Sequence, residues 1–270
     1  VIRLRPSVDG AIVATCALNG AAILWDAGSG AELRRVDGRG AAIDLVFHPD
    51  GERAVTANIG RGASVWRLAD GAELLHVPHD GLVETVRLDA RGERLLTTSY
   101  GDYQRGPFAA RVWDAATGAP LGAMQHSRYV EVAELSPCGR FVASAGDAGF
   151  VRVWDAATGA ELARLPHRAR VRALAFAPVT APVTAPVTAT GAATDAATDG
   201  GTSRLLATAG VDGIARLFRL PDGALLGELR HAKAIESVRF DPAGGALLTA
   251  GRDHTARLWT LRADLLAGAA

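Results

Sequence analysis

The chain has 270 residues, of which 49% are hydrophobic, so it is long enough to bury a substantial core. Its 29 basic and 29 acidic residues balance, which argues against recruitment by the charge of nucleic acid or an anionic membrane. No apolar run approaches the roughly 20 residues that span a bilayer. The two cysteines, Cys16 and Cys138, make neither a zinc pattern nor a disulfide framework. We therefore expect a cytoplasmic protein with no nucleic-acid or membrane partner.

Six alternating runs follow one another along the chain, and each is followed by a turn and a further apolar run. The aromatic residues that end these runs are separated by 41, 47, 41, 64 and 41 residues. A recurring period of roughly 40–45 residues predicts a repeat architecture. The aromatic residues are Trp25, Trp66, Trp113, Trp154, Phe218 and Trp259.

The fourth repeat shows the unit most clearly. Short runs over 130–135, 140–144, 150–154 and 161–165 predict four strands joined by tight turns. Glycine ends the first turn in most repeats, as at Gly139, because such turns need a residue with positive φ. Strands of this length without a helical period predict an all-β fold of four-stranded antiparallel sheets.

Two repeats are longer than the others. An enlarged turn over 99–108 lengthens the third repeat, and the segment 177–203 lengthens the fifth. The second insertion contains three copies of Ala-Pro-Val-Thr, so we expect a disordered low-complexity loop between the first two strands of its repeat. We expect a single domain over 1–270 that includes this loop and a short C-terminal tail over 261–270.

These features make the chain resemble the WD-repeat β-propeller family over about residues 1–260. The resemblance implies four-stranded blades, six of which are present here as a six-bladed ring or as part of a seven-bladed one. Three repeats keep the Trp-Asp pair, and three have a different residue in one or both positions. The pairs are Trp25-Asp26, Trp66-Arg67, Trp113-Asp114, Trp154-Asp155, Phe218-Arg219 and Trp259-Thr260.

Blades of this family share a hydrogen-bonded set of His, Ser or Thr, Asp and Trp. The resemblance implies that the indole N–H donates to the hydroxyl, while His and Asp complete the chain. The histidines then lie one per blade and form no metal or catalytic cluster. The expected sets are His79, Thr97 and Trp113; His126, Ser144 and Trp154; His167, Thr208 and Asp212; and His231, Thr249, Asp253 and Trp259.

The sequence offers no enzyme motif. It has no Gly-rich phosphate loop, no Ser-His-Asp arrangement that the spacing supports and no Cys/His cluster. We therefore expect no catalysis, metal or cofactor. The alternative is an enzyme or an ion-binding propeller, because Asp44, Glu84, Glu131 and Glu236 stand at similar positions in the first strands of their repeats and would line a channel.

Four arginines precede the ends of the third strands. They are distributed one per repeat and form no basic run, so we expect solvated side chains rather than nucleic-acid contacts. These arginines are Arg111, Arg152, Arg216 and Arg257.

The resemblance implies a non-catalytic protein–protein interaction scaffold or sensor module that binds a peptide or partner domain on the top face, where the turns lie. All three tyrosines of the chain fall in two turns of neighbouring repeats. Tyrosine and arginine often carry interface energy. The expected partner-binding residues are Tyr100, Tyr103, Arg105, Phe108, Arg128, Tyr129, Arg168, Arg252 and His254.

The composition, rich in Ala, Gly and Arg, suggests a bacterial source. The tail over 261–270 resembles the tails that follow WD arrays in bacterial multidomain ATPases, and the first residue is Val1. We expect a fragment of a larger signalling protein, monomeric if its ring closes.

Overall fold

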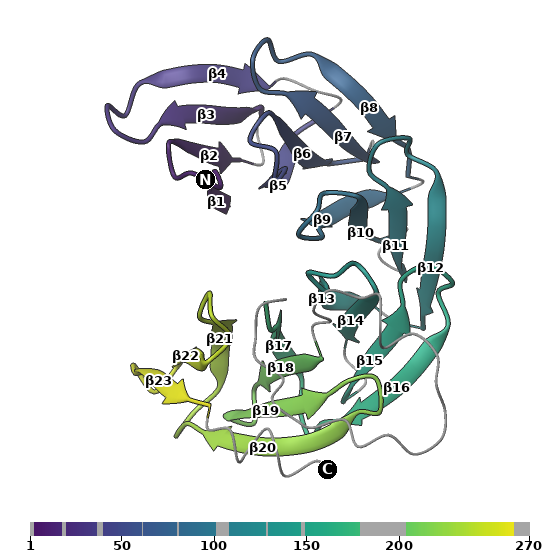
Figure 1. Cartoon of the computed structure of the whole chain (residues 1–270), viewed down its shortest axis with the longest axis vertical. Helices are drawn as coiled ribbons and strands as arrows, with labels where there is room; N and C mark the ends of the chain where they lie inside the picture. The colour runs from purple at the N-terminus through teal and green to yellow at the C-terminus, as the bar shows by residue number, and fades with distance from the viewer. Residues whose placement is uncertain are drawn as a thin grey trace. The chain divides into compact units, whose positions relative to one another are not determined.

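A computed structural model describes residues 3–17, 20–36, 40–60, 62–79, 81–100, 108–127, 129–146, 149–178 and 204–261. These residues form 23 strands arranged in six antiparallel sheets that follow the chain order (Figure 1). They contain no helix, and so none that could cross a membrane. The prediction of an all-β fold built from repeated antiparallel sheets, the blade pattern of a WD-repeat propeller, is confirmed.

The first compact unit comprises Val1–Val130 and Ala156–Gly159. It contains three sheets, each of four strands in sequential order. The strands are β1 (Arg3–Pro6), β2 (Ile12–Cys16), β3 (Ala22–Asp26), β4 (Glu32–Val36), β5 (Ala42–Phe47), β6 (Arg53–Asn58), β7 (Gly62–Arg67), β8 (Glu73–Val77), β9 (Leu82–Leu88), β10 (Arg94–Tyr100), β11 (Phe108–Asp114) and β12 (Pro120–His126).

The second compact unit comprises Glu131–Asp155 and Ala160–Ala270. Its first two sheets have four strands, and its last has three strands within the described residues. The strands are β13 (Val130–Leu135), β14 (Phe141–Gly146), β15 (Phe150–Asp155), β16 (Glu161–Pro166), β17 (Val171–Phe176), β18 (Leu205–Gly210), β19 (Ile214–Arg219), β20 (Ala224–Arg230), β21 (Ile235–Phe240), β22 (Ala246–Gly251) and β23 (Ala256–Thr260).

Parts of two predicted segments lie outside the described residues. They are 179–203, most of the expected loop insertion, and 262–270, most of the expected tail. The single domain over 1–270 stays a prediction.

Each unit buries its apolar side chains between successive sheets. The second strand of an inner sheet is covered on both faces, which explains why β6, β14 and β18 read as nearly continuous apolar runs. Complete burial of one large aliphatic side chain contributes about 2–3 kcal/mol. The four clusters contain Leu24 with Leu45, Val55 with Val86, Phe141 with Leu206, and Leu217 with Leu247.

The aspartate of the Trp-Asp pair closes the turn between the third and fourth strands. Asp114 Oδ1 accepts hydrogen bonds from the side chain and backbone of the residue three positions later, and these bonds lower its pKa. In two repeats an arginine replaces this aspartate, and an aspartate stands three residues later. Arg67 pairs with Asp70 at 3.2 Å, and Arg219 pairs with Asp222 at 2.6 Å. Both patterns hold the same turn, so loss of the Trp-Asp pair does not mean loss of the repeat.

Candidate functional site

The last sheet contains the complete set of hydrogen bonds expected for a repeat. Trp259 Nε1 donates to Thr249 Oγ1 over 2.8 Å, and His231 Nε2 lies 2.7 Å from the same oxygen. Asp253 Oδ2 lies 3.0 Å from His231 Nδ1. Because a carboxylate only accepts, Nδ1 donates to it and Nε2 accepts from the threonine. Burial opposes ionisation of Asp253, but the hydrogen bonds from His231 and Thr255 hold its pKa well below the ordinary value.

Four further sheets contain the bond from the indole N–H to a hydroxyl, over 2.7 to 2.9 Å. In the third sheet His79 Nε2 also lies 3.1 Å from Thr97 Oγ1. Burial, and then the charge of Arg111, lower the pKa of His79 to about 4. This histidine is therefore neutral at pH 7 and holds the sheet together. The indole pairs are Trp25 with Thr15, Trp66 with Thr56, Trp113 with Thr97, and Trp154 with Ser144.

The fifth sheet differs because its third strand has a phenylalanine in place of tryptophan. His167 Nδ1 donates to the carbonyl of Leu165 over 2.9 Å, and Nε2 accepts from Thr208 over 2.7 Å. Asp212 pairs with Arg216 Nη1 at 2.8 Å. The carboxylate grouped with the histidine in the expected set thus forms its ion pair with an arginine.

The third-strand arginines correct an expectation from the sequence. Arg216 is only 6% exposed and pairs with Glu228 at 3.2 Å as well as with Asp212. Arg152 lies 5.5 Å from the ring centroid of Trp154. These side chains cover the aromatic residues of their sheets, so the prediction that they are solvated is wrong for Arg216. Arg257, with 38% of its side chain exposed, does face solvent.

The histidines contact separate hydroxyls. His79, His167 and His231 each contact the threonine of their own sheet, and His126 lies half-buried at the end of β12. Across the residues that the structure describes, no group of three or more His, Cys, Asp or Glu side chains is arranged to hold a metal ion.

Two expected partner-binding residues have described side chains in the first unit. Tyr129 directly precedes β13, is half-buried, and donates its hydroxyl to Glu84 Oε2 over 3.2 Å. Phe108 is the first residue of β11, so it lies in a strand rather than in the enlarged turn. Tyr100 likewise ends β10, and its side chain is outside the described part. The remaining ones outside the described residues are Tyr103, Arg105 and Arg128.

The second unit holds the other three. Arg168 is exposed in the turn between β16 and β17. Arg252 and His254 are exposed in the turn between β22 and β23. Arg252 is fixed by a 2.6 Å ion pair to Glu236, and His254 has a φ of 63°. The structure thus brings Arg252 and His254 together in one turn.

A β-bulge recurs near the start of the first strand. The extra residue is Glu84 in β9 and Glu236 in β21, but in β5 it is Ile43. Asp44 therefore does not share the position of the two glutamates, contrary to the sequence prediction. Counting from Arg39, which stands where other repeats have histidine, misplaces it by one residue.

The first-strand carboxylates already have partners within the chain. Glu131 pairs with Arg170, and also with Arg172 at 3.6 Å. Glu84 accepts from Tyr129, and Glu236 pairs with Arg252, as described above. A cation would have to displace these partners, so the geometry gives the ion-binding alternative no support.

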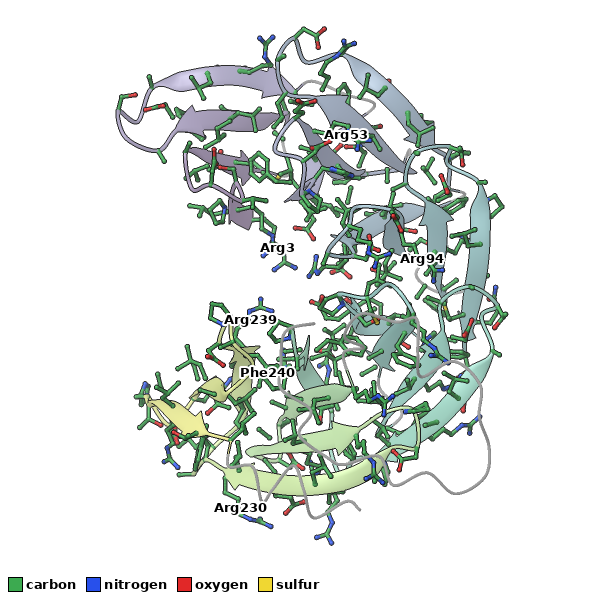
Figure 2. All side chains as sticks on the ribbon, in the orientation of Figure 1. Arg3, Arg53, Arg94, Arg230, Arg239 and Phe240 are labelled. Carbon is green, nitrogen blue, oxygen red and sulfur yellow. The ribbon has the colours of Figure 1, made fainter. Side chains whose placement is uncertain are left out.

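Asp44 differs from these glutamates because it is fully buried. Arg5 Nη2 lies 3.2 Å from one carboxylate oxygen, and Arg87 Nη1 lies 2.8 Å from the other. Arg3 Nε is 4.0 Å away, and Figure 2 shows this side chain projecting from β1 on the side away from β2. We call Asp44, Arg3, Arg5 and Arg87 the Asp44 cluster. The sequence showed the alternating arginines of β1 but not that three repeats' first strands converge on one carboxylate.

A cavity of about 330 Å³ lies in the second unit at the ends of β13, β17 and β21. Its walls are mostly apolar, with Phe176 and Phe240 among them, and Arg239 stands on β21 beside Phe240 (Figure 2). The sequence did not predict this cavity, because its residues come from three repeats.

Comparison with known proteins agrees with this repeat structure. Residues 118–155 and 223–260 match the family model "WD domain, G-beta repeat" (WD40). Each match ends with the third strand of a sheet, at Asp155 and Thr260. Proteins with WD40 repeats generally act as scaffolds that bind other proteins.

Three curated proteins share a short similar segment. Pre-mRNA-processing factor 19 homolog 2 of Arabidopsis thaliana is 43% identical over 56 residues, which is 20% of this chain and 11% of that protein. The other two are the same component of chromatin assembly factor 1, which is 42% identical over 69 residues in Gallus gallus and 41% over 64 in Mus musculus. These segments cover 23% and 21% of this chain, and the matches span 12% and 11% of those relatives.

Proposed function

We propose that the chain is a non-catalytic scaffold that binds a peptide or partner domain through side chains at the turns that precede the first strands and join the second and third strands. We call these side chains the tyrosine surface. The observation that carries the proposal is Tyr129, an aromatic side chain held on a rigid strand start by Glu84. The tyrosine surface comprises Tyr100, Tyr103, Arg105, Phe108, Arg128, Tyr129, Arg168, Arg252 and His254.

Rigid placement favours binding because little conformational entropy is lost on association. The hydrogen bond to Glu84 limits the rotamers of Tyr129, and the ion pair to Glu236 limits those of Arg252. Arg168 is exposed and has no ion pair within the described residues, so its guanidinium is available to an acidic group of a partner. Aromatic rings beside arginine are common in interface hot spots.

The wider setting belongs to the same proposal. The balance of 29 basic and 29 acidic residues favours a protein partner over nucleic acid. Cys16 and Cys138 are free thiols, which suits the reducing cytoplasm. We place the chain as the sensor array of a larger bacterial signalling protein.

The test replaces Tyr100, Tyr103 and Tyr129 together by alanine and measures the affinity for a partner isolated with the wild-type chain. We expect at least a hundredfold loss with little change in melting temperature. Tyr129→Phe, which removes only the contact with Glu84, separates the ring from the hydroxyl and should cost less than tenfold. Unchanged affinity of the triple variant would refute the surface.

A further inference from the structure

The Asp44 cluster contains more positive than negative charge. Three guanidinium groups lie within 4.0 Å of the two oxygens of one carboxylate. Cys16 is the ionisable group paired across the sheet with Arg3, and burial raises the pKa of its thiol to about 12. The thiol is therefore neutral at pH 7, and the cluster has an excess of about two positive charges.

Neutralising Asp44 does not require all three arginines. Arg5 and Arg87 already occupy one carboxylate oxygen each, and Arg87 Nη1 also donates to the carbonyl of Val86 over 2.8 Å. Arg3 makes no hydrogen bond within the described residues, and 44% of its side chain is exposed. Like charges held this close repel one another, so a bound anion would stabilise the cluster.

Ion pairing elsewhere on the chain is more nearly one to one. Arg53 pairs with Asp50 at 2.7 Å, and Arg252 pairs with Glu236 at 2.6 Å. In both pairs the carboxylate is partly exposed, whereas that of Asp44 is fully buried. Excess arginine around a buried, fixed carboxylate is thus a local property of the first unit.

Guanidinium groups match phosphate oxygens because they present parallel N–H donors in a plane. An excess of two charges suits a dianion best. We propose that Arg3, Arg5 and Arg87, held in place by Asp44, bind a dianionic phosphoryl group such as a phosphate monoester. This site is separate from the tyrosine surface and does not depend on the proposed function.

The phosphoryl group has two potential sources, a small free phosphate ester or a phosphorylated side chain of a partner. The test titrates the purified full chain with phosphoserine, and then with a phosphoserine-containing hexapeptide, by calorimetry at constant ionic strength. Saturable binding of either probe at one site per chain is expected. Tighter binding of the peptide assigns a phosphorylated partner, and equal binding assigns a small ester; both results support the site.

Variants locate the binding. Arg3→Gln removes the most exposed arginine of the cluster and should weaken phosphoserine binding about tenfold or more. Arg91→Gln is the matched control, because Arg91 is exposed in the turn after β9 and the variant changes net charge equally. Arg5→Lys keeps the charge but removes the planar donors, and it should also weaken binding. Melting curves establish that each variant is folded.

Three results would overturn the proposal. The first is the absence of saturable binding of either probe at millimolar concentration. The second is equal weakening by Arg3→Gln and Arg91→Gln, which would show general attraction by net charge. The third is tighter binding of an unstructured RNA octamer than of phosphoserine, because RNA presents monoanionic diesters rather than a dianionic group.

Discussion

Arg87 and Arg239 occupy the same place in two repeats but have different surroundings. Each follows the first-strand residue that pairs with the threonine of the neighbouring strand, Thr97 in β10 and Thr249 in β22. Arg87 forms a 2.8 Å ion pair with the buried Asp44. Arg239 is exposed, lines the cavity of the second unit, and has no ion pair within the described residues.

One residue in the preceding sheet accounts for the difference. Asp44 lies opposite Ala57 in β6, and the corresponding residue opposite Ala209 in β18 is Ala173. An alanine there offers Arg239 no carboxylate. The comparison shows that hydroxyls, glycines and aromatic residues keep the repeat, while the first strands vary in charge and can therefore differ in ligand.

The largest expected effect comes from removing the carboxylate of the paired region. Asp44→Asn should lower the free energy of unfolding by about 3–5 kcal/mol, because it leaves partly buried guanidinium groups without their counter-charge. Urea unfolding measures the loss. Glu236→Gln is the control, since that pair is largely exposed and should cost less than about 1 kcal/mol. Equal losses in the two variants would contradict the assigned role of burial.

Acid should affect the first unit through His79. Its pKa in the folded chain is about 4, below the ordinary 6.5, so the folded chain binds fewer protons than the unfolded chain between these values. Stability is therefore retained above pH 6.5 and falls as the pH drops toward 4, by at most about 3 kcal/mol. Urea unfolding at pH 7, 5 and 4 measures this, and His79→Gln should flatten the profile. An unchanged slope in that variant would assign the acid sensitivity to other groups.

Removing the two equivalent arginines gives the smallest effects. Arg87→Ala should cost about 1–2 kcal/mol, because Asp44 keeps Arg5 but loses one hydrogen-bonded partner. Arg239→Ala should change the free energy of unfolding by less than about 0.5 kcal/mol. The same urea titrations compare them, and a larger loss for Arg239→Ala would show that Arg239 has a structural partner.

Local signals explain which parts of the fold could be predicted. Turn glycines such as Gly51 have a φ near 74°, and most of the tryptophans bond to hydroxyls ten residues earlier within the same sheet, as Trp66 does with Thr56. Both features depend on neighbours in one repeat, so the repeated sequence makes them visible. The strands of the fourth repeat accordingly begin or end within two residues of the predicted bounds.

Contacts between repeats were not predictable in this way. The burial of Arg216 depends on Asp212 and Glu228, and the Asp44 cluster joins the first strands of three repeats. A bulge of one residue also reverses the side on which a side chain lies, which displaced Asp44 from its expected position. Among the expected partner-binding residues, the sequence identified Tyr129 but not its contact with Glu84.

The most direct test of the proposed scaffold uses a photoreactive phenylalanine at position 129 in the otherwise unchanged chain. The control places the same residue at Leu33, which is 50% exposed on the outer strand β4. We predict that a bound partner crosslinks to position 129 and not to position 33. Crosslinking at position 33 alone would contradict partner binding through the tyrosine surface.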